Sequence, residues 1–355
     1  MIKKVFFPIL CLIFINLSCT KEKTDVYAAC ELTPSGTYLI KWETYPPLSG
    51  NVKIYESSSP DSFNMALPIT ERDVTVGYQY VLPMPYVART YFKLVFNRKY
   101  STVTSNRIIP AENIHNFRDM GGYQNKEKKQ TRWGKLYRSG TLALASILDL
   151  NLLNQLKIKT IIDFRTERDS YSYPLIYQSE QVFNFPLRGN NYNVFLDKVV
   201  SQKMKRSDVI LYSQGILYSL LENNVDYFMK MFDILLEEDN YPVIFFCSQG
   251  KDRSAIAASL ILAALDMDKE TIINDYMQSN DVLDDILPSL IDNVDKFNMD
   301  VQETITILYR ANKEYLTYIL DKIEKDYGST SNYLEKELKL TNKKRDKLKE
   351  ILLYE

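Results

Sequence analysis

The sequence predicts two folded units of different class: an N-terminal all-β sandwich over residues 26–109 and an α/β unit over residues 110–355. Two patterns support this division. Short runs rich in β-branched and aromatic residues, divided by turn clusters, fill the first unit, and no helical period interrupts them. From residue 110 onward, strand-like apolar runs alternate with helical stretches, which is typical of a central, mostly parallel sheet flanked by helices.

The composition is that of a globular chain with balanced charge. Lys and Arg together number 44 and Asp and Glu 45, so nothing in the net charge favours binding to nucleic acid. The 26 tyrosines suit aromatic strands. A chain of 355 residues is long for one small domain, which agrees with two units.

Residues 1–18 are predicted to be a signal peptide outside the fold, followed by a tether over residues 19–25. Lys3 and Lys4 precede the apolar run Val5–Ile15, which is too short to span a bilayer but suits export. The Ser18-Cys19 pair that follows resembles a bacterial lipoprotein signal, which implies acylation of Cys19 and stable membrane anchoring at the periplasmic or cell-surface side. The alternative is an ordinary cleaved signal peptide.

Cysteine usage fits this interpretation. With Cys11 removed and Cys19 lipidated, only Cys30 and Cys247 remain, which is no disulfide framework. An exported protein that keeps a free Cys247 thiol suggests that the thiol is needed. Cys30 is expected to be a small buried residue.

The first unit contains five expected strands: Tyr38–Trp42, Val52–Tyr55, Tyr78–Leu82, Tyr91–Phe96 and Thr102–Ile109. Proline, glycine and polar clusters such as Pro46-Pro47 and Pro83–Pro85 divide them. Trp42 on an early strand and Tyr91 on a late one resemble a fibronectin type III domain. We expect a spacer that lifts the second unit off the membrane, with a binding module as the alternative.

The second unit follows a linker at residues 110–112 and predicts strands and helices in alternation. The expected strands are Trp133–Arg138, Ile158–Phe164, Val182–Pro186 and Val243–Phe246, and the expected helices before residue 269 are Ser146–Leu156, Val225–Glu238 and Ala255–Leu265. Residues 190–214 are expected to be irregular and to form a lid. The remainder is expected to be almost all helical, with one helix over Glu303–Tyr327 that ends at Gly328.

The loop Cys247–Ser254, between an expected strand and an expected helix, has the chemistry of a phosphate site. A loop that enters a helix presents unpaired N–H groups to a common point, and the helix dipole favours an anion there. Gly250 lets the backbone approach the ligand, and Arg253 offers a planar fork for two phosphate oxygens. The same field favours the thiolate of Cys247, which makes it a nucleophile, and Ser254 could donate a hydrogen bond to the sulfur.

This loop resembles that of the cysteine-dependent phosphatases, in which five residues separate Cys and Arg and a Ser or Thr follows. Its Gly-Lys-Asp-Arg-Ser ending is similar to the bacterial tyrosine phosphatase family that also acts on phosphoinositides. Four further segments match that family in order: N-F-R-D-M-G-G at 116–122, Y-R-S-G at 137–140, I-I-D-F-R-T-E-R at 161–168 and the terminal Y-G-S…Y-L-E-K-E-L stretch at 327–338. The resemblance covers residues 109–355 and implies phosphomonoester hydrolysis through a phosphocysteine, with no metal or cofactor.

The resemblance also implies roles for single residues. Cys247 would attack phosphorus, and Arg253 with the backbone amides of Ser248–Arg253 would hold the phosphate. Asp252 is the first candidate for the general acid, Asp163 the second and Asp119 the third; a structural salt bridge is the alternative for the last two. The full phosphate-binding set is Ser248, Gln249, Gly250, Lys251, Asp252, Arg253, Ser254 and Arg165.

Asp163 and Arg165 follow one expected strand and the Cys247 loop follows another. Ligands bind at the carboxyl ends of strands in such sheets, so these residues can converge. Lys251 would add positive charge at the pocket rim for substrates with several phosphates; the alternative is a solvated loop lysine. Phe246 departs from the family, which usually has His there.

Phosphotyrosine is the leading substrate class, with phosphoinositides or inositol phosphates behind it. Phe246 motivates a different alternative, a pseudophosphatase that binds phosphorylated ligands without turnover. A sulfurtransferase is a further alternative, since such enzymes also use a loop cysteine.

Overall fold

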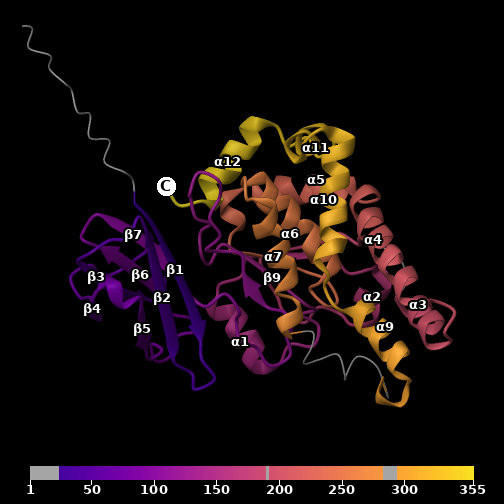
Figure 1. The fold of residues 1–355 in the computed structure, drawn as a ribbon, viewed down its shortest axis with the longest axis horizontal. Coiled ribbons are helices and arrows are strands. Elements are labelled where there is room, and N and C mark those ends of the chain that lie inside the picture. The colour runs from indigo at the N-terminus through magenta and orange to yellow at the C-terminus, as the bar shows by residue number, and fades with distance from the viewer. Residues whose placement is uncertain (1–23, 189–191, 283–293) are drawn as a thin grey trace, which may run out of the picture.

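The computed structural model describes residues 24–188, 192–282 and 294–355. Two antiparallel sheets precede a mixed sheet that carries most of the helices (Figure 1). No helix within the described ranges is long and apolar enough to cross a bilayer. The expected signal peptide and the residues around Cys19 lie outside the described residues.

The N-terminal sheets have three and four strands. The first has the order β1-β2-β5 and contains Asp25–Leu32, Tyr38–Tyr45 and Tyr78–Val81; the second has the order β4-β3-β6-β7 and contains Thr70–Asp73, Asn51–Ser57, Tyr91–Phe96 and Tyr100–Thr104. All pairings in both sheets are antiparallel. Strands β1 and β4 were not expected, and β7 ends at Thr104, short of the predicted Ile109.

Both sheets contribute to one hydrophobic core. Alternate residues of β2 point into it, including Ile40 and Trp42, and Leu94 and Phe96 come from β6 of the other sheet. The indole N–H of Trp42 donates to the carbonyl of Val74 at 2.8 Å. Cys30 lies in this core, where burial raises the pKa of its thiol to about 12, as expected of a structural cysteine.

The mixed sheet has the order β11-β10-β12-β9-β8. Its four longer strands are parallel and comprise Gln181–Asn184, Thr160–Asp163, Val243–Phe246 and Leu136–Ser139, while the two-residue β8, Arg118–Asp119, is antiparallel. The mostly parallel α/β sheet predicted from the sequence is therefore confirmed. Its central strand β12 is fully buried.

Helices cover both faces of this sheet. They are α1 Ile147–Gln155, α2 Glu167–Ser172, α3 Tyr192–Val200, α4 Arg206–Glu222, α5 Val225–Leu235, α6 Asp252–Ala264, α7 Lys269–Met277, α9 Met299–Tyr309, α10 Lys313–Tyr327, α11 Thr330–Lys336 and α12 Asn342–Leu352. Val243 and Phe245 of β12 face the core shared with α4–α6 and α10–α12, and Ile244 and Phe246 face the smaller core with α1. Figure 1 shows α1 below the sheet and α5 and α6 above it.

Two expectations for this part were wrong. Residues 192–200 and 206–222, inside and beyond the segment expected to be irregular, are helical because Val209, Ser213 and Leu217 repeat at helical spacing and are buried. The single helix expected over Glu303–Tyr327 is two helices. Asn312 begins the second one, since its side chain accepts a hydrogen bond from the N–H of Glu314 at 3.0 Å.

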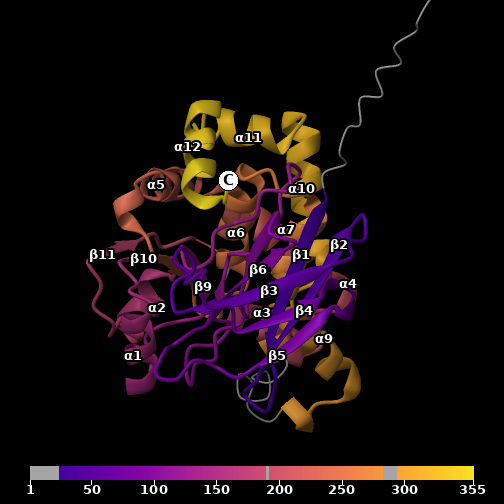
Figure 2. The same cartoon turned by 90° about the vertical axis from the view of Figure 1, so that its left-hand side faces the viewer.

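A buried polar contact joins the N-terminal sheets to the rest of the chain. Figure 2 shows strands of these sheets, in indigo and violet, in front of the helical part. Arg89 forms an ion pair with Asp119, and both side chains are almost fully buried. The guanidinium also lies 5.2 Å from the ring centroid of Trp133, whose indole N–H donates to the carbonyl of Val103 at 2.9 Å. Tyr91 packs with Trp133 and Val103 and not with Trp42, so it belongs to this contact.

Candidate active site

Strand β12 delivers Cys247 to the start of the loop, and Asp252 begins α6. Cys247 is a free cysteine with 4% of its surface exposed. Gly250 has a φ of +68°, and a Cβ at that position would lie 2.5 Å from the carbonyl carbon of Ser139. Only glycine therefore allows the loop to curl against the 137–140 segment.

Buried side chains hold the carbonyls of this loop from behind. The side-chain amide of Asn116 donates to the carbonyl of Gly250 at 2.9 Å, and the guanidinium of Arg138 donates to the same oxygen at 2.8 Å. Arg138 also reaches the carbonyl of Lys251 at 3.2 Å, and Asn116 that of Gln249 at 3.3 Å. With the carbonyls held outward in this way, the amides of the loop are available on its other side for an anion.

Asp275 on α7 anchors these side chains in turn. Its carboxylate forms buried ion pairs with Arg118 and Arg138 and accepts a hydrogen bond from the hydroxyl of Tyr123 at 2.8 Å. Burial alone would raise the pKa of Asp275, but the two arginines and the Tyr123 hydrogen bond outweigh it and lower the pKa to about 2. The N-F-R-D and Y-R-S-G segments thus meet behind the phosphate loop.

Arg253, in the first turn of α6, lies beside the loop with its side chain 19% exposed. One terminal nitrogen donates to the carbonyl of Phe164 at 3.2 Å. Both terminal nitrogens approach one carboxylate oxygen of Asp169, at 3.4 and 3.5 Å, and the hydroxyl of Ser248 donates to the same oxygen at 3.0 Å. Asp169 on α2 was not predicted from the sequence.

Asp163 and Arg165 lie next to the loop, as expected from the strand order, but they bind each other. The guanidinium of Arg165 contacts both carboxylate oxygens of Asp163, and both side chains are 2% exposed. Its remaining nitrogen donates to Thr141 and to the carbonyl of Tyr173, and the group lies 5.2 Å from the ring centroid of Phe246. These contacts favour the structural salt bridge over a free acid.

Lys251 and Asp252 also differ from the simplest expectation. The ammonium of Lys251 is buried, not at a rim, and donates to the carbonyls of Leu308 and Tyr309 at 3.2 and 2.8 Å, at the end of α9. Asp252 lies beside it at 3.4 Å and accepts a hydrogen bond from the hydroxyl of Tyr276 at 3.2 Å. The lysine charge therefore compensates the negative end of a helix dipole.

Three further residues named in the sequence analysis have simple environments. Asp119 is completely buried, pairs with Arg89, and accepts hydrogen bonds from the N–H groups of Gly121 and Gly134 at 2.7 and 2.8 Å, so its place is structural. The buried hydroxyl of Ser254 has no hydrogen-bond partner among the described atoms. Phe246 is fully buried in the core with α1.

Comparison with known proteins identifies the fold that carries this loop. A family model described as "Tyrosine phosphatase family" matches residues 109–354. The chain belongs to the tyrosine phosphatase family. This phosphatase is 25% identical, over 246 residues, to a Cupriavidus necator protein with the provisional name tyrosine-protein phosphatase, a match that spans 68% of this chain and 87% of the relative.

Other similar proteins cover less of the chain or resemble it weakly. The triple specificity protein phosphatase PtpB of Mycobacterium tuberculosis is 27% identical over 103 residues, which are 26% of this chain and 37% of the relative. The solved core domain of the S. cerevisiae PP-IP phosphatase SIW14 covers 61% of this chain and 94% of its own length, with 16% identity and a TM-score of 0.27. For P. aeruginosa TpbA bound to pTyr, the coverages are 51% and 89%, the identity 15% and the TM-score 0.24.

Sequence reasoning placed Asn116 and Arg138 in segments that match the family but did not assign them the role of holding the loop. It singled out neither Asp169 nor Asp275. A signal existed for Asp169, because Thr166 three residues earlier has the spacing of a helix cap, and its hydroxyl does accept a hydrogen bond from the Asp169 N–H at 3.2 Å. This spacing predicts where α2 begins, but it does not predict that Asp169 contacts Arg253. Asp275 lies in an unremarkable helix, and no local pattern distinguishes it.

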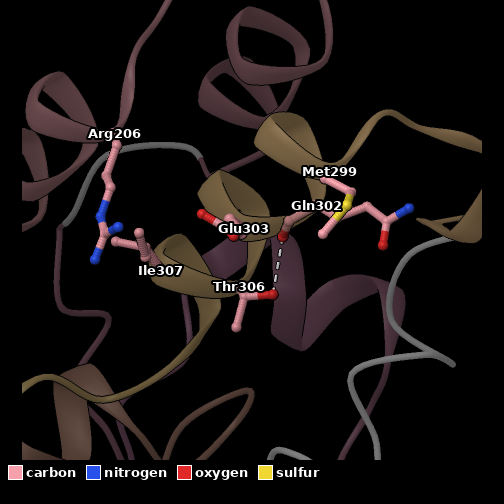
Figure 3. Close-up of a pocket in the computed structure, with 6 residues that line it drawn as sticks. All are labelled: Arg206, Met299, Gln302, Glu303, Thr306 and Ile307. Carbon is pink, nitrogen blue, oxygen red and sulfur yellow. Dashed lines mark hydrogen bonds between the residues drawn. The ribbon is translucent and has the colours of Figure 1, made fainter.

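A hollow of about 470 Å³ lies between the start of α4 and α9 (Figure 3). It is lined by Arg206, Met299, Gln302, Glu303, Thr306 and Ile307, and the drawn hydrogen bond joins Thr306 to the backbone of Gln302. None of the residues expected to bind phosphate lines it. Among the described residues, no cluster of His, Cys, Asp and Glu could hold a metal ion.

Proposed function

We propose that Cys247 is the nucleophile of this tyrosine phosphatase and that Arg253 and the amides of Ser248–Arg253 bind the transferred phosphate. The supporting observation is the loop itself, which presents its amides at the start of α6 while Asn116 and Arg138 hold its carbonyls from behind. Such preorganised donors stabilise the charge of a pentavalent transition state and cost no reorganisation during the reaction.

The chemistry then proceeds in two steps. The thiolate of Cys247 attacks phosphorus, so that a sulfur–phosphorus bond forms as the bond to the leaving oxygen breaks and that oxygen takes a proton. A water molecule next attacks the phosphocysteine, which releases inorganic phosphate and the thiolate. Ser254, whose hydroxyl has no other partner among the described atoms, is available to stabilise the departing sulfur.

Asp252 is our proposal for the general acid of the first step. It lies in the first turn of α6, next to the loop, and its own cation, Lys251 at 3.4 Å, is shared with two backbone carbonyls at the end of α9. Both oxygens of Asp163, in contrast, are held by the guanidinium of Arg165. An acid matters most for a poor leaving group, so Asp252→Asn should slow phenyl phosphate hydrolysis more than p-nitrophenyl phosphate hydrolysis. If Asp163→Asn shows this dependence instead, the acid is Asp163.

The test of the nucleophile is Cys247→Ser. This variant should lose turnover of p-nitrophenyl phosphate and keep binding of inorganic phosphate, because the amides and Arg253 remain. Retained turnover would contradict the mechanism. Wild-type protein that binds phosphate without turnover would instead favour the pseudophosphatase, an alternative motivated by Phe246 at the position where the family usually has His.

We propose phosphotyrosine as the main substrate class, in line with the name of the family. Phosphoinositides or inositol phosphates are the alternative. The burial of Lys251 argues against them, because its ammonium is engaged at the end of α9 and is not presented to a second phosphate. A panel that compares phosphotyrosyl peptides with inositol phospholipids decides between the two.

We also propose that the protein is an exported lipoprotein anchored through Cys19, with residues 26–109 as a fibronectin type III-like sandwich that serves as a spacer before the phosphatase domain at 110–355. The antiparallel sheets with a common core support the sandwich. The Lys3-Lys4 pair, the apolar run and Ser18-Cys19 support the anchor. Cys19→Ala should move the protein from the membrane fraction to the soluble fraction, and a variant that stays with the membrane would contradict acylation at Cys19.

A further inference from the structure

Asp169 places a charged carboxylate directly against the proposed phosphate site. The residue lies in the first turn of α2, with its side chain 35% exposed, and Thr166 caps that helix. One carboxylate oxygen accepts the hydrogen bond of Ser248 at 3.0 Å and lies 3.4 Å from the nearer nitrogen of Arg253. It is therefore in contact with both ends of the proposed cradle, at Ser248 and at Arg253.

The contacts of Arg253 show which of its donors remain for a ligand. One terminal nitrogen uses its two hydrogens for the carbonyl of Phe164 and the carboxylate of Asp169. The other terminal nitrogen uses one of its hydrogens for Asp169. Within the described part of the chain, the Nε–H of Arg253 has no hydrogen-bond partner. The Nε–H and the second hydrogen of the terminal nitrogen that contacts only Asp169 therefore remain for a ligand. Together these two N–H groups form a side-on fork, which matches two oxygens of a phosphate.

We propose that Asp169 is a positioning residue that holds Arg253 with this side-on fork toward the phosphate, while Ser248 ties the same carboxylate to the loop. This inference rests on the proposed function of Arg253. The Phe164 carbonyl and Asp169 fix two directions of one planar group, so the guanidinium cannot rotate about its long side chain without losing one of them.

The carboxylate acts in this role as an anion, not as a proton donor. Partial burial by itself would raise the pKa of Asp169, but the charge of Arg253 and the hydrogen bonds from Ser248 and Thr166 lower the pKa below its ordinary value. An ionised group at neutral pH can orient Arg253 but has no proton for a leaving oxygen. The role is thus distinct from that of the general acid, for which Asp252 is proposed.

Asp169→Asn tests this role, because it keeps the shape and the oxygen that accepts from Ser248 but removes the charge. We expect kcat/KM to fall about 10- to 100-fold, by the same factor for p-nitrophenyl phosphate and phenyl phosphate, because a misplaced catalytic group affects every substrate alike. The inhibition constant of orthovanadate, which mimics the transition state, should rise by that factor, and the basic side of the pH–rate profile should not change. Asp169→Glu, which restores the charge, should recover part of the activity.

Glu167→Gln is the matched control, since Glu167 is an exposed acid in the same turn of α2 and no contact joins it to the loop in the described part of the structure. It should behave as the wild type, and circular dichroism should show that every variant is folded. A fall in kcat/KM that is confined to phenyl phosphate, together with a flattened basic side of the pH–rate profile, would identify Asp169 as the general acid and overturn the inference. An unchanged Asp169→Asn would overturn it as well. Cys247→Ser in the same assays separates the two proposals, because retained turnover there refutes the nucleophile whatever Asp169 does.

Discussion

The ion pair between Arg89 and Asp119 should carry much of the stability that links the N-terminal sheets to the phosphatase part. Arg89 makes the ion pair through one terminal nitrogen, donates to the carbonyl of Asn106 through the other, and donates to the hydroxyl of Ser105 through Nε at 3.0 Å. Replacing it with Met keeps the apolar stem but leaves the carboxylate of Asp119 buried without a cation.

Breaking a buried ion pair from one side costs about 3–5 kcal/mol of folding free energy. Asp119 would keep the hydrogen bonds from Gly121 and Gly134, so we expect Arg89→Met to lie near the lower end, at about 3 kcal/mol. Asp119→Asn in the same chain removes the uncompensated charge. The double variant should therefore be more stable than Arg89→Met alone, by about 1–2 kcal/mol.

The measurement is urea unfolding followed by tryptophan fluorescence. The chain has two tryptophans, and they report on different places: Trp42 lies in the core of the N-terminal sheets and Trp133 lies beside Arg89. If Arg89→Met loses less than about 1 kcal/mol of unfolding free energy, the ion pair behaves as an exposed one, and the reasoning from burial is refuted. A double variant that is less stable than Arg89→Met would refute it as well.

Three further predictions follow from particular contacts. Gly250→Ala should lower kcat/KM at least about 100-fold because its Cβ meets the backbone of Ser139, whereas Gly215→Ala on α4, which meets nothing within 4 Å, should leave activity unchanged. The pKa of Asp275 is lowered from 3.8 to about 2, so its contribution to stability is complete above pH 3.8 and fades as the pH falls toward 2. Asp275→Asn should lower the free energy of unfolding at pH 7. In the same variant, that free energy should depend less on pH between 3.8 and 2, as followed by circular dichroism. Residues 109–355 alone should fold and hydrolyse p-nitrophenyl phosphate with reduced thermal stability, because Trp133 becomes exposed; a folded truncation without turnover would show that the N-terminal sheets complete the site.

The sequence by itself determined the elements around the phosphate loop. The apolar run at 243–246 is the central strand, as predicted, and the predicted helix after Cys247 is present. Only its start differs, because it begins at Asp252 and not at the predicted Ala255. Strand, helix and strand in alternation correctly gave a mostly parallel sheet, since parallel strands need such crossovers. These features are local, because a period of two or 3.6 residues and the conformational freedom of Gly250 are properties of the chain over a few positions.

Local pattern was weaker where polar residues interrupted it. The helices α3 and α4 overlap a stretch in which polar residues and tyrosines interrupt the apolar ones. The helical spacing of Val209, Ser213 and Leu217 is present in the sequence, but it becomes clear only once the burial of these residues is known. Strand β4 has a single partly buried residue, Thr70, among Thr70–Asp73, and forms because β3 offers it a partner. Tertiary contacts decided these elements against their weak local preferences.

Apart from the local pair of Asp163 and Arg165, the partners of the charged residues at the site were decided by the tertiary structure alone. Asp163 pairs with Arg165, but Lys251 reaches the end of α9, Asn116 reaches Gly250 and Asp169 reaches Arg253. The last three contacts join residues 58, 134 and 84 positions apart. Spacing along the chain says which chemical groups are present, but a buried charge takes whichever counter-charge or dipole the packed helices and strands bring within reach, and that meeting exists only in the folded chain.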